Sequence, residues 1–477
     1  MSIYKKTMWS FLSIVGVQVI NIIANIFLAR ILVPEYFGIL GMAIVFAGLA
    51  FVIQDSGFSA YLIYTKNKTK TLIQTTLLIN IFFSLLLAIL IYVLSPSIAI
   101  FYNSPEVETV IKYISIGIVF GSIGTTSKAL LMREGKFNKV TLIDIFSEII
   151  SSVSAIIIAL YFDGLLAISL KYILRPTFQS IFSIIIEPIS LKNVVFDIKE
   201  ITSLVLFNYK VLGSQIFMYI NNNIDYLIVG KNLGNYTLGL YTVAFQWGSI
   251  ARYYISNAVM RVLFPETSRL ENDLEKVRGL FYNVVSKLAM ITLPVCFGLS
   301  MVSKEFIHIV YGNEWLGVVD PLRILLIAGG IASITVIGGP MLRGIGRPQI
   351  EMYISIISCV FFSVLLIIFV KYGLKVVAYV ELFRVIIIES LRIVLLRKYL
   401  EIKIRKVWKL LLPTLLSLFI MIVAIITFHH LFKDIINIYL LFLLKINIGI
   451  FSYLFTSYFV NNKEMKFLIN KLIPKRS

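Results

Sequence analysis

The sequence has few of the residues from which soluble active sites and disulfide frameworks are built. Only 14% of its 477 residues are charged, and it contains two cysteines and three histidines. The cysteines lie inside apolar runs and the histidines are not spaced with them as metal ligands are, so we expect neither disulfides nor a metal site. No polar stretch is long enough to form a globular domain, which excludes a soluble fold.

Motifs for nucleotide-driven or covalent chemistry are also absent from the sequence. It has no glycine-rich phosphate loop of an ATPase, and the glycines of the GIGRP segment lie in a turn rather than between a strand and a helix. A membrane glycosyltransferase, ligase or polymerase usually needs a sizeable outer loop or acidic residues and histidines on the outer face, and the expected outer loops are short and poor in both residue types. We therefore expect no catalytic residues, no cofactor and no enzymatic activity.

Long apolar runs dominate what is present. Hydrophobic residues make up 59% of the chain, and apolar runs long enough to span a membrane recur from Met8 to Val460. The first run is too long for a signal peptide, so we expect it to be an uncleaved first span. A window of about 20 residues predicts an all-α integral membrane protein with about 14 transmembrane helices. The predicted helices cover residues 8–32, 36–61, 74–94, 110–131, 140–161, 165–186, 203–229, 237–260, 281–302, 319–340, 350–370, 376–396, 410–428 and 437–460.

The distribution of Lys and Arg predicts the orientation of these helices. With both termini in the cytoplasm, the cytoplasmic segments contain 27 of the 44 basic residues and the outer loops contain five. Basic residues are retained on the cytoplasmic side, so this bias predicts cytoplasmic N and C termini. The net charge of +19 then reflects topology and contact with anionic lipids, and it gives no reason to expect a nucleic-acid partner.

An internal repeat divides the chain. The segment NIIANIFLARILVPEYFGILGMA aligns with NNIDYLIVGKNLGNYTLGLYTVA at an offset of 201 residues, which pairs Gly38 with Gly239. Two further matches follow at offsets of 209 to 211, between SPSIAIFYN and KEFIHIVYG and between LMREGKF and MLRGIGRP. The repeat predicts two parallel six-helix lobes, 1–202 and 203–409, related by a pseudo-two-fold axis along the membrane normal. A terminal helix pair and a basic tail occupy 410–477.

The first helix of each lobe has a polar stripe at helical spacing. Polar side chains that face lipid are costly, so we expect these residues to face other helices, as hydrogen-bonding partners, or a water-filled lumen. Their duplication in the two lobes favours the lumen. The stripe consists of Gln18, Asn21 and Asn25 in the first lobe and of the repeat-equivalent Tyr219, Asn222 and Tyr226 in the second.

Basic residues inside the predicted spans indicate an anionic cargo. Each costs about 2.5 to 3.5 kcal/mol at the bilayer centre, so several together need a wet cavity or an anionic partner. Neutralisation by a local acid is an alternative for Arg384, three residues from Glu381, and similarly for Arg392. It does not suit Lys171 and Arg175, whose own helix offers no acid nearby. The predicted cationic cavity consists of Arg30, Lys171, Arg175, Lys210, Arg252 and Arg384.

Acidic residues inside the spans are candidates for coupling transport to an ion gradient. Asp55 and Asp225 are the better candidates for binding a proton or a sodium ion, because neither has a basic residue three or four positions away. Pairing with a nearby Lys or Arg is an alternative for all the intramembrane acids, including Asp144, Glu148, Glu381 and Glu389.

Four segments, in order along the chain, resemble those of one transporter family. They include LARILVPEYFGILGMA, ISNAVMRVLFPETSRL, VYGNEWLGVVDPLRILL and MLRGIGRPQIEM. The sequence resembles the Wzx-like oligosaccharide flippases of the lipopolysaccharide and teichuronic-acid export type, in the superfamily that also contains the multidrug extruders and the lipid II flippase. The resemblance covers the chain up to about residue 400, and the terminal helix pair favours the lipid-linked sugar branch over the twelve-helix drug extruders.

The resemblance implies two six-helix bundles around a V-shaped central cavity and alternating access for an undecaprenyl pyrophosphate-linked oligosaccharide. It implies that cavity cations hold the pyrophosphate, although of the predicted residues only Arg30 lies in a quoted segment. It also implies a multi-pass protein of the bacterial cytoplasmic membrane that serves surface polysaccharide synthesis, with a polysaccharide polymerase and its chain-length machinery as further partners. A cation-coupled multidrug extruder of the same fold is the alternative, and it would need an acidic or aromatic cavity.

Overall fold

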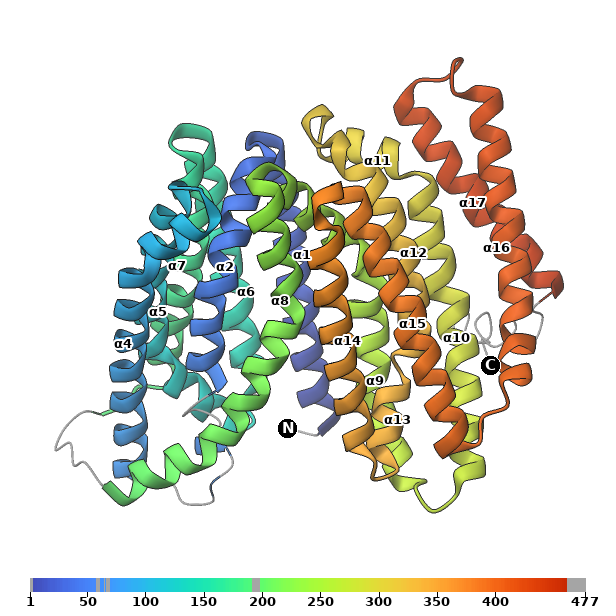
Figure 1. Ribbon diagram of the computed structural model, residues 1–477. Helices are drawn as coiled ribbons and strands as arrows, with labels where there is room; N and C mark the ends of the chain where they lie inside the picture. Colours follow the sequence, from blue (N-terminus) through green and yellow to red (C-terminus); the bar gives the residue numbers. More distant parts are fainter. Residues whose placement is uncertain (1–2, 57–60, 64, 66–68, 191–197, 461–477) are drawn as a thin grey trace, which may run out of the picture. The chain divides into compact units, whose positions relative to one another are not determined.

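The computed structural model describes residues 3–56, 61–63, 65, 69–190 and 198–460. All regular elements among these residues are helices (Figure 1). Ten of the described helices are long and apolar enough to cross a membrane. Together with the composition, these helices make the chain a multi-pass membrane protein.

The structure divides into two compact units, Met1–Gly239 and Leu240–Ser477. The first contains α1 (Ile3–Ile31), α2 (Pro34–Ser56), α4 (Lys70–Tyr102), α5 (Glu106–Arg133), α6 (Phe137–Tyr161), α7 (Gly164–Ile186) and most of α8 (Ile198–Gly248). The second contains the end of α8, η1 (Ala251–Ser256), α9 (Asn257–Arg269), α10 (Leu274–Met301), α11 (Ser303–Val310), η2 (Asn313–Val318), α12 (Val319–Thr335), α13 (Gly338–Gly344), α14 (Pro348–Phe369), η3 (Val370–Tyr372), α15 (Leu374–Leu400), α16 (Ile404–Phe432) and α17 (Ile438–Val460).

Caps and small residues position the helices of the first unit. Thr69 and Asp163 accept hydrogen bonds from backbone N–H groups in the first turns of α4 and α7. Gly124 of α5 lies against Ser180 of α7, where a Cβ would come within 2.1 Å of the Ser180 Cα. Because this contact admits no side chain, it brings the two backbones close together. Helix α7 also packs along α6, so its side chains meet those of both neighbours.

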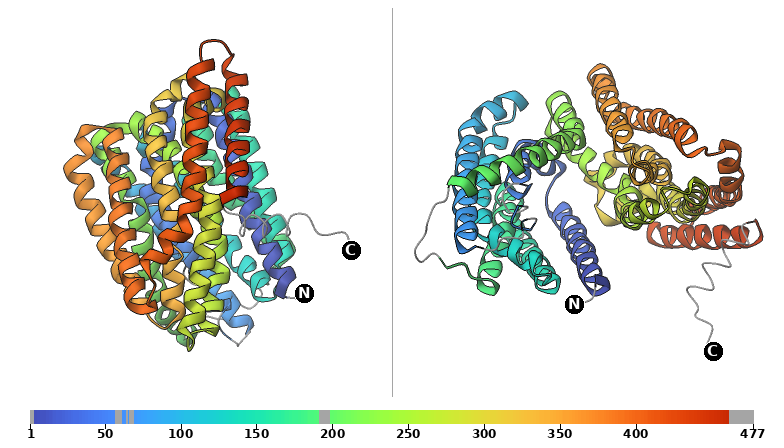
Figure 2. Two further views of the ribbon diagram at one scale, coloured as in Figure 1. Left: turned by 90° about the vertical axis from the view of Figure 1, so that its right-hand side faces the viewer. Right: turned by 90° about the horizontal axis from the view of Figure 1, so that it is seen from below.

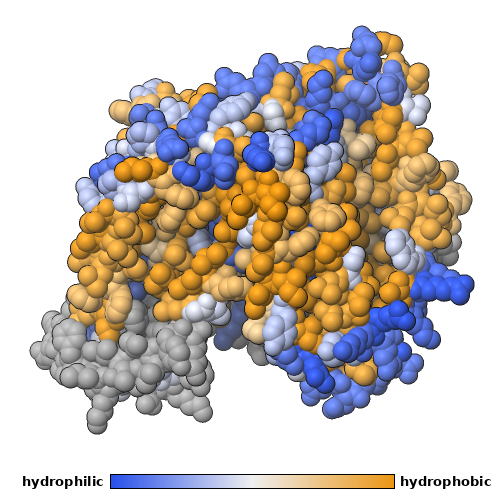
Figure 3. Space-filling view, in the orientation of Figure 1, coloured by the Kyte–Doolittle hydropathy of each residue, from blue (hydrophilic) through white to orange (hydrophobic). Residues whose placement is uncertain are grey.

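The core of the second unit is an apolar cluster between α10, α13, α15 and α16. Phe281, Leu288, Met341, Leu396 and Leu418 all belong to it and are at most 4% exposed. Helices α16 and α17 pack against each other, and α10 packs against α16 (Figure 2). Apolar residues also cover the flanks of the helices, whereas hydrophilic residues gather at their ends (Figure 3). Lipid is as apolar as these side chains, so close packing stabilises the cluster more than burial from water does.

The helices follow the predicted spans, with differences in the middle of the chain. The predicted helices 203–229 and 237–260 are joined in α8, which is interrupted at Gly234, a glycine in the left-handed region with φ 78°. Helix α8 then ends at Gly248, and the rest of the second predicted span continues through the π-helical η1 into α9. Helices α7 and α15 are continuous, but polar and charged residues interrupt their apolar sequence. They are therefore not among the ten helices that are apolar enough to be membrane-span candidates. The count of 14 spans and the cytoplasmic termini stay predictions.

The repeat-paired glycines meet in one helix crossing within the first unit. A Cβ on Gly38 of α2 would lie 1.7 Å from the carbonyl oxygen of Asn235, and a Cβ on Gly239 would lie 1.9 Å from that of Pro34. Pro34 and Asn235 are also 201 residues apart. The repeat therefore pairs Gly38 with Gly239 and Pro34 with Asn235, so each of the two contacts is the repeat equivalent of the other. Such reciprocity is the property of a two-fold contact. It packs residues 235–239 of α8 against α2 within the first unit, whereas the lobe boundaries 1–202, 203–409 and 410–477 stay predictions.

Candidate functional site

The first unit contains a polar cavity of about 520 Å³. Helices α1, α2, α5, α6 and α7 contribute its lining. Four of the predicted residues lie together here, because Gln18 and Asn21 line the cavity from α1 and Lys171 and Arg175 line it from α7. The remaining polar residues of the lining are Ser13, Lys128, Asp144 and Gln179.

Glu148 of α6 pairs with both cations of α7. Lys171 Nζ lies 3.0 Å from Glu148 Oε1, and Arg175 Nε lies 3.0 Å from Glu148 Oε2. The Glu148 side chain is completely buried. The expectation that neutralisation by an acid does not suit Lys171 and Arg175 is therefore wrong. It considered only acids of the same helix, whereas the partner comes from α6, which packs along α7.

A second carboxylate, Asp144, lies one helical turn before Glu148 and, unlike the buried Glu148, lines the cavity. Lys128 Nζ of α5 lies 2.5 Å from Asp144 Oδ1. Gln179 Nε2 donates to the same oxygen at 3.1 Å, and the Ser13 hydroxyl donates to Oδ2 at 2.9 Å. Lys128 is a basic residue inside the predicted span 110–131, which is the signal that singled out Lys171, but sequence reasoning passed over it. Gln179 carries no such signal.

The cavity has a small excess of positive charge. Lys128, Lys171 and Arg175 contribute three cations, and Asp144 and Glu148 contribute two carboxylates. These ion pairs lie between helices in a setting of low dielectric, where charges interact more strongly than in water. The arrangement can therefore attract an anion while each cation is already held in place.

The polar stripe divides between the two expected environments. Gln18 and Asn21 line the cavity, and Asn25 donates a hydrogen bond to Asn21 Oδ1 at 2.9 Å within α1. The Tyr219 hydroxyl donates to the carbonyl oxygen of Ile44 at 2.6 Å, so this residue joins α8 to α2 as an interhelical hydrogen-bonding partner. Of the other stripe residues in α8, Asn222 is exposed and Tyr226 is half-buried.

The other predicted cavity and coupling residues lie outside this cavity. Arg30 is exposed in the last turn of α1, and Asp225 is buried in α8. Arg252 is half-buried in the second unit, where it lines a small crevice that also contains Glu381. The side chains of Asp55 and Lys210 fall outside the described residues.

In the second unit, Arg384 and Arg392 of α15 are both paired with carboxylates. Arg384 donates from Nε to Glu381 Oε2 at 2.6 Å, from its second terminal nitrogen to Glu381 Oε1, and from Nη1 to the Ser358 hydroxyl at 2.8 Å. Arg392 lies 2.5 Å from Glu389 and 3.1 Å from Glu351. The alternative of neutralisation by local acids is thus confirmed for both arginines.

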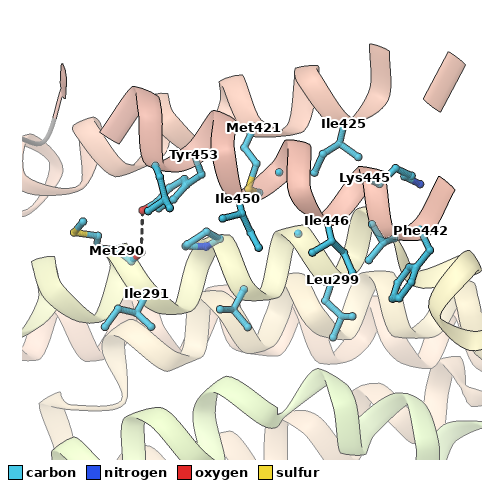
Figure 4. Close-up of a pocket in the computed structure, with 16 residues that line it drawn as sticks. Met290, Ile291, Leu299, Met421, Ile425, Phe442, Lys445, Ile446, Ile450 and Tyr453 are labelled. Atoms are coloured by element: carbon cyan, nitrogen blue, oxygen red, sulfur yellow. Dashed lines mark hydrogen bonds between the residues drawn. The ribbon is translucent and has the colours of Figure 1, made fainter. Parts of the chain in front are cut away.

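The larger cavities of the second unit are apolar. One of about 370 Å³ lies between α10, α16 and α17, lined by residues such as Leu299, Met421 and Ile450 (Figure 4). The Tyr453 hydroxyl donates to the Met290 carbonyl oxygen at 2.8 Å across this cavity. Another of about 420 Å³ lies between α10, α12, α15 and α16 and is also mostly apolar. Neither resembles the charged cavity of the first unit.

Comparison with known proteins places these features in a family. The model of a family described as "Polysaccharide biosynthesis protein" matches residues 27–320, which is more than half of the chain. The chain is 30% identical over 306 residues to the teichuronic acid biosynthesis protein TuaB of Bacillus subtilis (strain 168), an alignment that covers 63% of each chain. It is 24% identical over 367 residues to the lipopolysaccharide biosynthesis protein WzxC of Escherichia coli (strain K12), covering 76% of this chain and 75% of that one.

A solved structure shares the fold over nearly the whole length. The lipid II flippase MurJ, in an inward closed conformation, matches with a TM-score of 0.74 and 18% sequence identity. The match covers 96% of this chain and 99% of that one. The structural match includes α16 and α17, because it leaves only a small part of either chain uncovered.

Proposed function

The chain belongs to the polysaccharide biosynthesis protein family, and on this premise we propose that it is a flippase for an undecaprenyl pyrophosphate-linked oligosaccharide in the bacterial cytoplasmic membrane. The translocated unit serves the assembly of a surface polysaccharide such as O-antigen, capsule, exopolysaccharide or teichuronic acid. The observation that carries the proposal is a polar cavity, with more cations than carboxylates, inside a helical membrane protein.

The chemistry of the cavity suits a phosphate-bearing head group. Phosphate oxygens form short, charge-assisted hydrogen bonds with Lys and Arg, and these replace the hydration shell that is lost on entry. Lys128 and Arg175 supply such donors, and Lys171, whose Nζ is buried beside Glu148, adds positive charge. The amides of Gln18 and Asn21 both donate and accept, so they suit sugar hydroxyl groups. Arg30, Lys210 and Arg252 stay proposed cargo-binding cations outside this cavity, whereas Arg384, whose three nitrogens all donate to protein groups, is dropped from the proposed set.

Alternating access moves the head group. Two lobes, 1–202 and 203–409, rock about the cargo and expose it first to one side of the membrane and then to the other. The polyprenyl tail remains in lipid throughout. The protein lowers a translocation barrier and makes or breaks no covalent bond, and the polymerase and chain-length machinery take up the product on the outer face.

A buried acid couples transport to a proton or sodium gradient in this proposal. Asp225 is 3% exposed within α8, and Asp55 is the second candidate. If Asp225 binds the coupling ion, Asp225→Asn should leave transport insensitive to collapse of the gradient, measured as the rate of lipid-linked oligosaccharide translocation in vesicles. An unchanged gradient response in this variant would remove Asp225 from the coupling step.

The drug-extruder alternative fits the cavity less well. A cationic drug needs an uncompensated carboxylate or an aromatic surface. Asp144 and Glu148 are both held by Lys or Arg, and the cavity's cations outnumber them. An anionic cargo is therefore favoured over a cationic one.

A neutral replacement of the buried cluster tests the function. Removing Lys171 and Arg175 alone would leave the buried Glu148 carboxylate without a cation, which costs about 3–5 kcal/mol. The variant therefore combines Lys171→Gln, Arg175→Gln and Glu148→Gln. We expect loss of surface polysaccharide with an unchanged amount of protein in the membrane, measured by polysaccharide immunoblotting and by quantifying the protein. Normal polysaccharide in this variant would overturn the assignment of the cavity.

A matched control replaces two cations and one carboxylate elsewhere. Arg269, Lys276 and Glu266 are exposed residues of surface ion pairs, so their replacement by Gln should leave polysaccharide output unchanged. Deletion of the gene identifies the cargo, because the undecaprenyl-linked oligosaccharide that accumulates on the inner leaflet is the untransported substrate. If no such intermediate accumulates, the protein is not the flippase of that pathway.

A further inference from the structure

Glu148 occupies a distinctive position beneath the cavity. It is completely buried, and it is not itself part of the cavity lining. Its two carboxylate oxygens are divided between the two cations of α7, with Oε1 3.0 Å from Lys171 Nζ and Oε2 3.0 Å from Arg175 Nε. The Ser152 hydroxyl, one turn further along α6, donates to Oε1 at 3.3 Å. The carboxylate is thus fixed from three sides.

The contact to Arg175 uses only one of its three nitrogens. Arg175 Nε and Glu148 Oε2 form an ion pair rather than a hydrogen bond, and four of the five N–H donors of a guanidinium are on its terminal nitrogens. The terminal nitrogens of Arg175 have no hydrogen-bonding partner among the described residues, and the side chain, 36% exposed, lines the cavity. Four donors in a planar fork are therefore available to a ligand in the cavity. This fork matches the spacing of two phosphate oxygens.

Arg384 in the second unit serves as a comparison, because its contacts are those of a purely structural arginine. All three of its nitrogens donate to protein groups, two of them to Glu381 and one to Ser358. Its side chain is 15% exposed. A ligand would have to displace a carboxylate to reach it, whereas Arg175 offers its terminal nitrogens without losing the contact to Glu148.

We infer that Glu148 is a positioning residue that holds Arg175 by Nε so that its terminal fork binds a phosphate group of the cargo in two-pronged fashion. The inference rests on the proposed function of the cavity. Glu148 touches no cargo and acts through Arg175, while Lys171 shares the carboxylate and compensates its charge. The contact restricts the rotamers of a flexible side chain before the ligand arrives, which lowers the entropy cost of binding.

A positioning role and a purely electrostatic role of Glu148 predict opposite effects of Glu148→Gln on anion binding. Glu148→Gln raises the net charge of the cluster by one, so a purely electrostatic role predicts tighter binding of an anion. A positioning role predicts weaker binding, because an uncharged amide with one acceptor cannot hold both cations. Glu148→Asp keeps the charge but withdraws the carboxylate by one methylene, so only the positioning role predicts a change.

The experiment measures binding of inorganic pyrophosphate to the detergent-purified full-length protein by isothermal titration calorimetry. We expect both Glu148→Asp and Glu148→Gln to weaken binding about tenfold, as the loss of one charge-assisted contact does. The control is Glu108→Gln, a substitution in a half-exposed pair with Lys112 on α5, and it should bind as the wild type does. Unchanged or tighter binding in both Glu148 variants would overturn the inference.

A double-mutant cycle separates positioning from a general structural effect. Arg175→Lys removes the fork, so adding Glu148→Asp to it should weaken binding no further. If the two effects simply add, Glu148 does not act through Arg175 and the inference fails. If wild-type binding is absent or indifferent to Arg175→Lys, the proposed cargo site itself fails. If binding depends on Arg175 but not on Glu148, only the positioning role is lost.

Discussion

The two units differ in the surroundings of their intramembrane basic side chains. In the first, Lys128, Lys171 and Arg175 line a polar cavity, and Arg175 keeps its terminal nitrogens available beyond its contact with a carboxylate. In the second, Arg384 and Arg392 are enclosed by carboxylates on α14 and α15, and the larger cavities are apolar. The difference shows that an intramembrane cation is not by itself a cargo site. We propose that a cargo-binding residue is distinguished by the number of donors left after its structural contacts are made.

The largest expected effect concerns a structural arginine of the second unit. Arg392 is 6% exposed and pairs with Glu389 and Glu351, so Arg392→Gln leaves two carboxylates without their cation. We expect a loss of about 3–5 kcal/mol in the free energy of unfolding, measured by chemical denaturation in detergent. The control Lys375→Gln breaks an exposed pair with Asp320 and should cost less than about 1 kcal/mol. Equal effects of the two substitutions would show that Arg392 is not structural.

The sequence was sufficient to predict the helices and part of the cavity, because both depend on local patterns. Apolar runs marked the spans, and unusual charges inside them marked Lys171 and Arg175. The 201-residue offset paired Gly38 with Gly239, which the structure places in one reciprocal crossing. These signals are read along a single helix or a single alignment, and they need no knowledge of which helices touch.

The partners of those charges could not be predicted, because they depend on helix packing. Glu148 was recognised as an intramembrane acid, but its pairing with Lys171 and Arg175 follows from the register of α6 against α7. Tyr219 was placed in a lumen by its repeat position, whereas the structure gives it a hydrogen bond to the Ile44 carbonyl oxygen. Spacing within a helix defines a face but not the neighbour that the face meets.

A second, smaller effect tests the contact between the repeat-paired segments of the first unit. Gly38→Ala and Gly239→Ala each place a Cβ within 2 Å of a backbone oxygen, so the helices must move apart. We expect each to cost about 1–3 kcal/mol of stability, partly offset by the better helix propensity of Ala. Because the contacts are reciprocal, the two substitutions should have similar effects on the melting temperature. Gly213→Ala, with no atom within 4 Å of its Cβ, is the control and should not destabilise.

The smallest effect on stability is expected for Lys128 of the first unit, whose surroundings differ most from those of Arg392 in the second unit. Lys128→Gln removes the 2.5 Å pair with Asp144, but the carboxylate keeps hydrogen bonds from Ser13 and Gln179 and faces a polar cavity. We therefore expect a smaller loss in the free energy of unfolding than for Arg392→Gln, because Asp144 keeps two hydrogen-bond donors. Polysaccharide output should nevertheless fall, because one of three cavity cations is gone. If Lys128→Gln destabilised the protein as much as Arg392→Gln, the cations of the first unit would be structural too, and the contrast between the units would disappear.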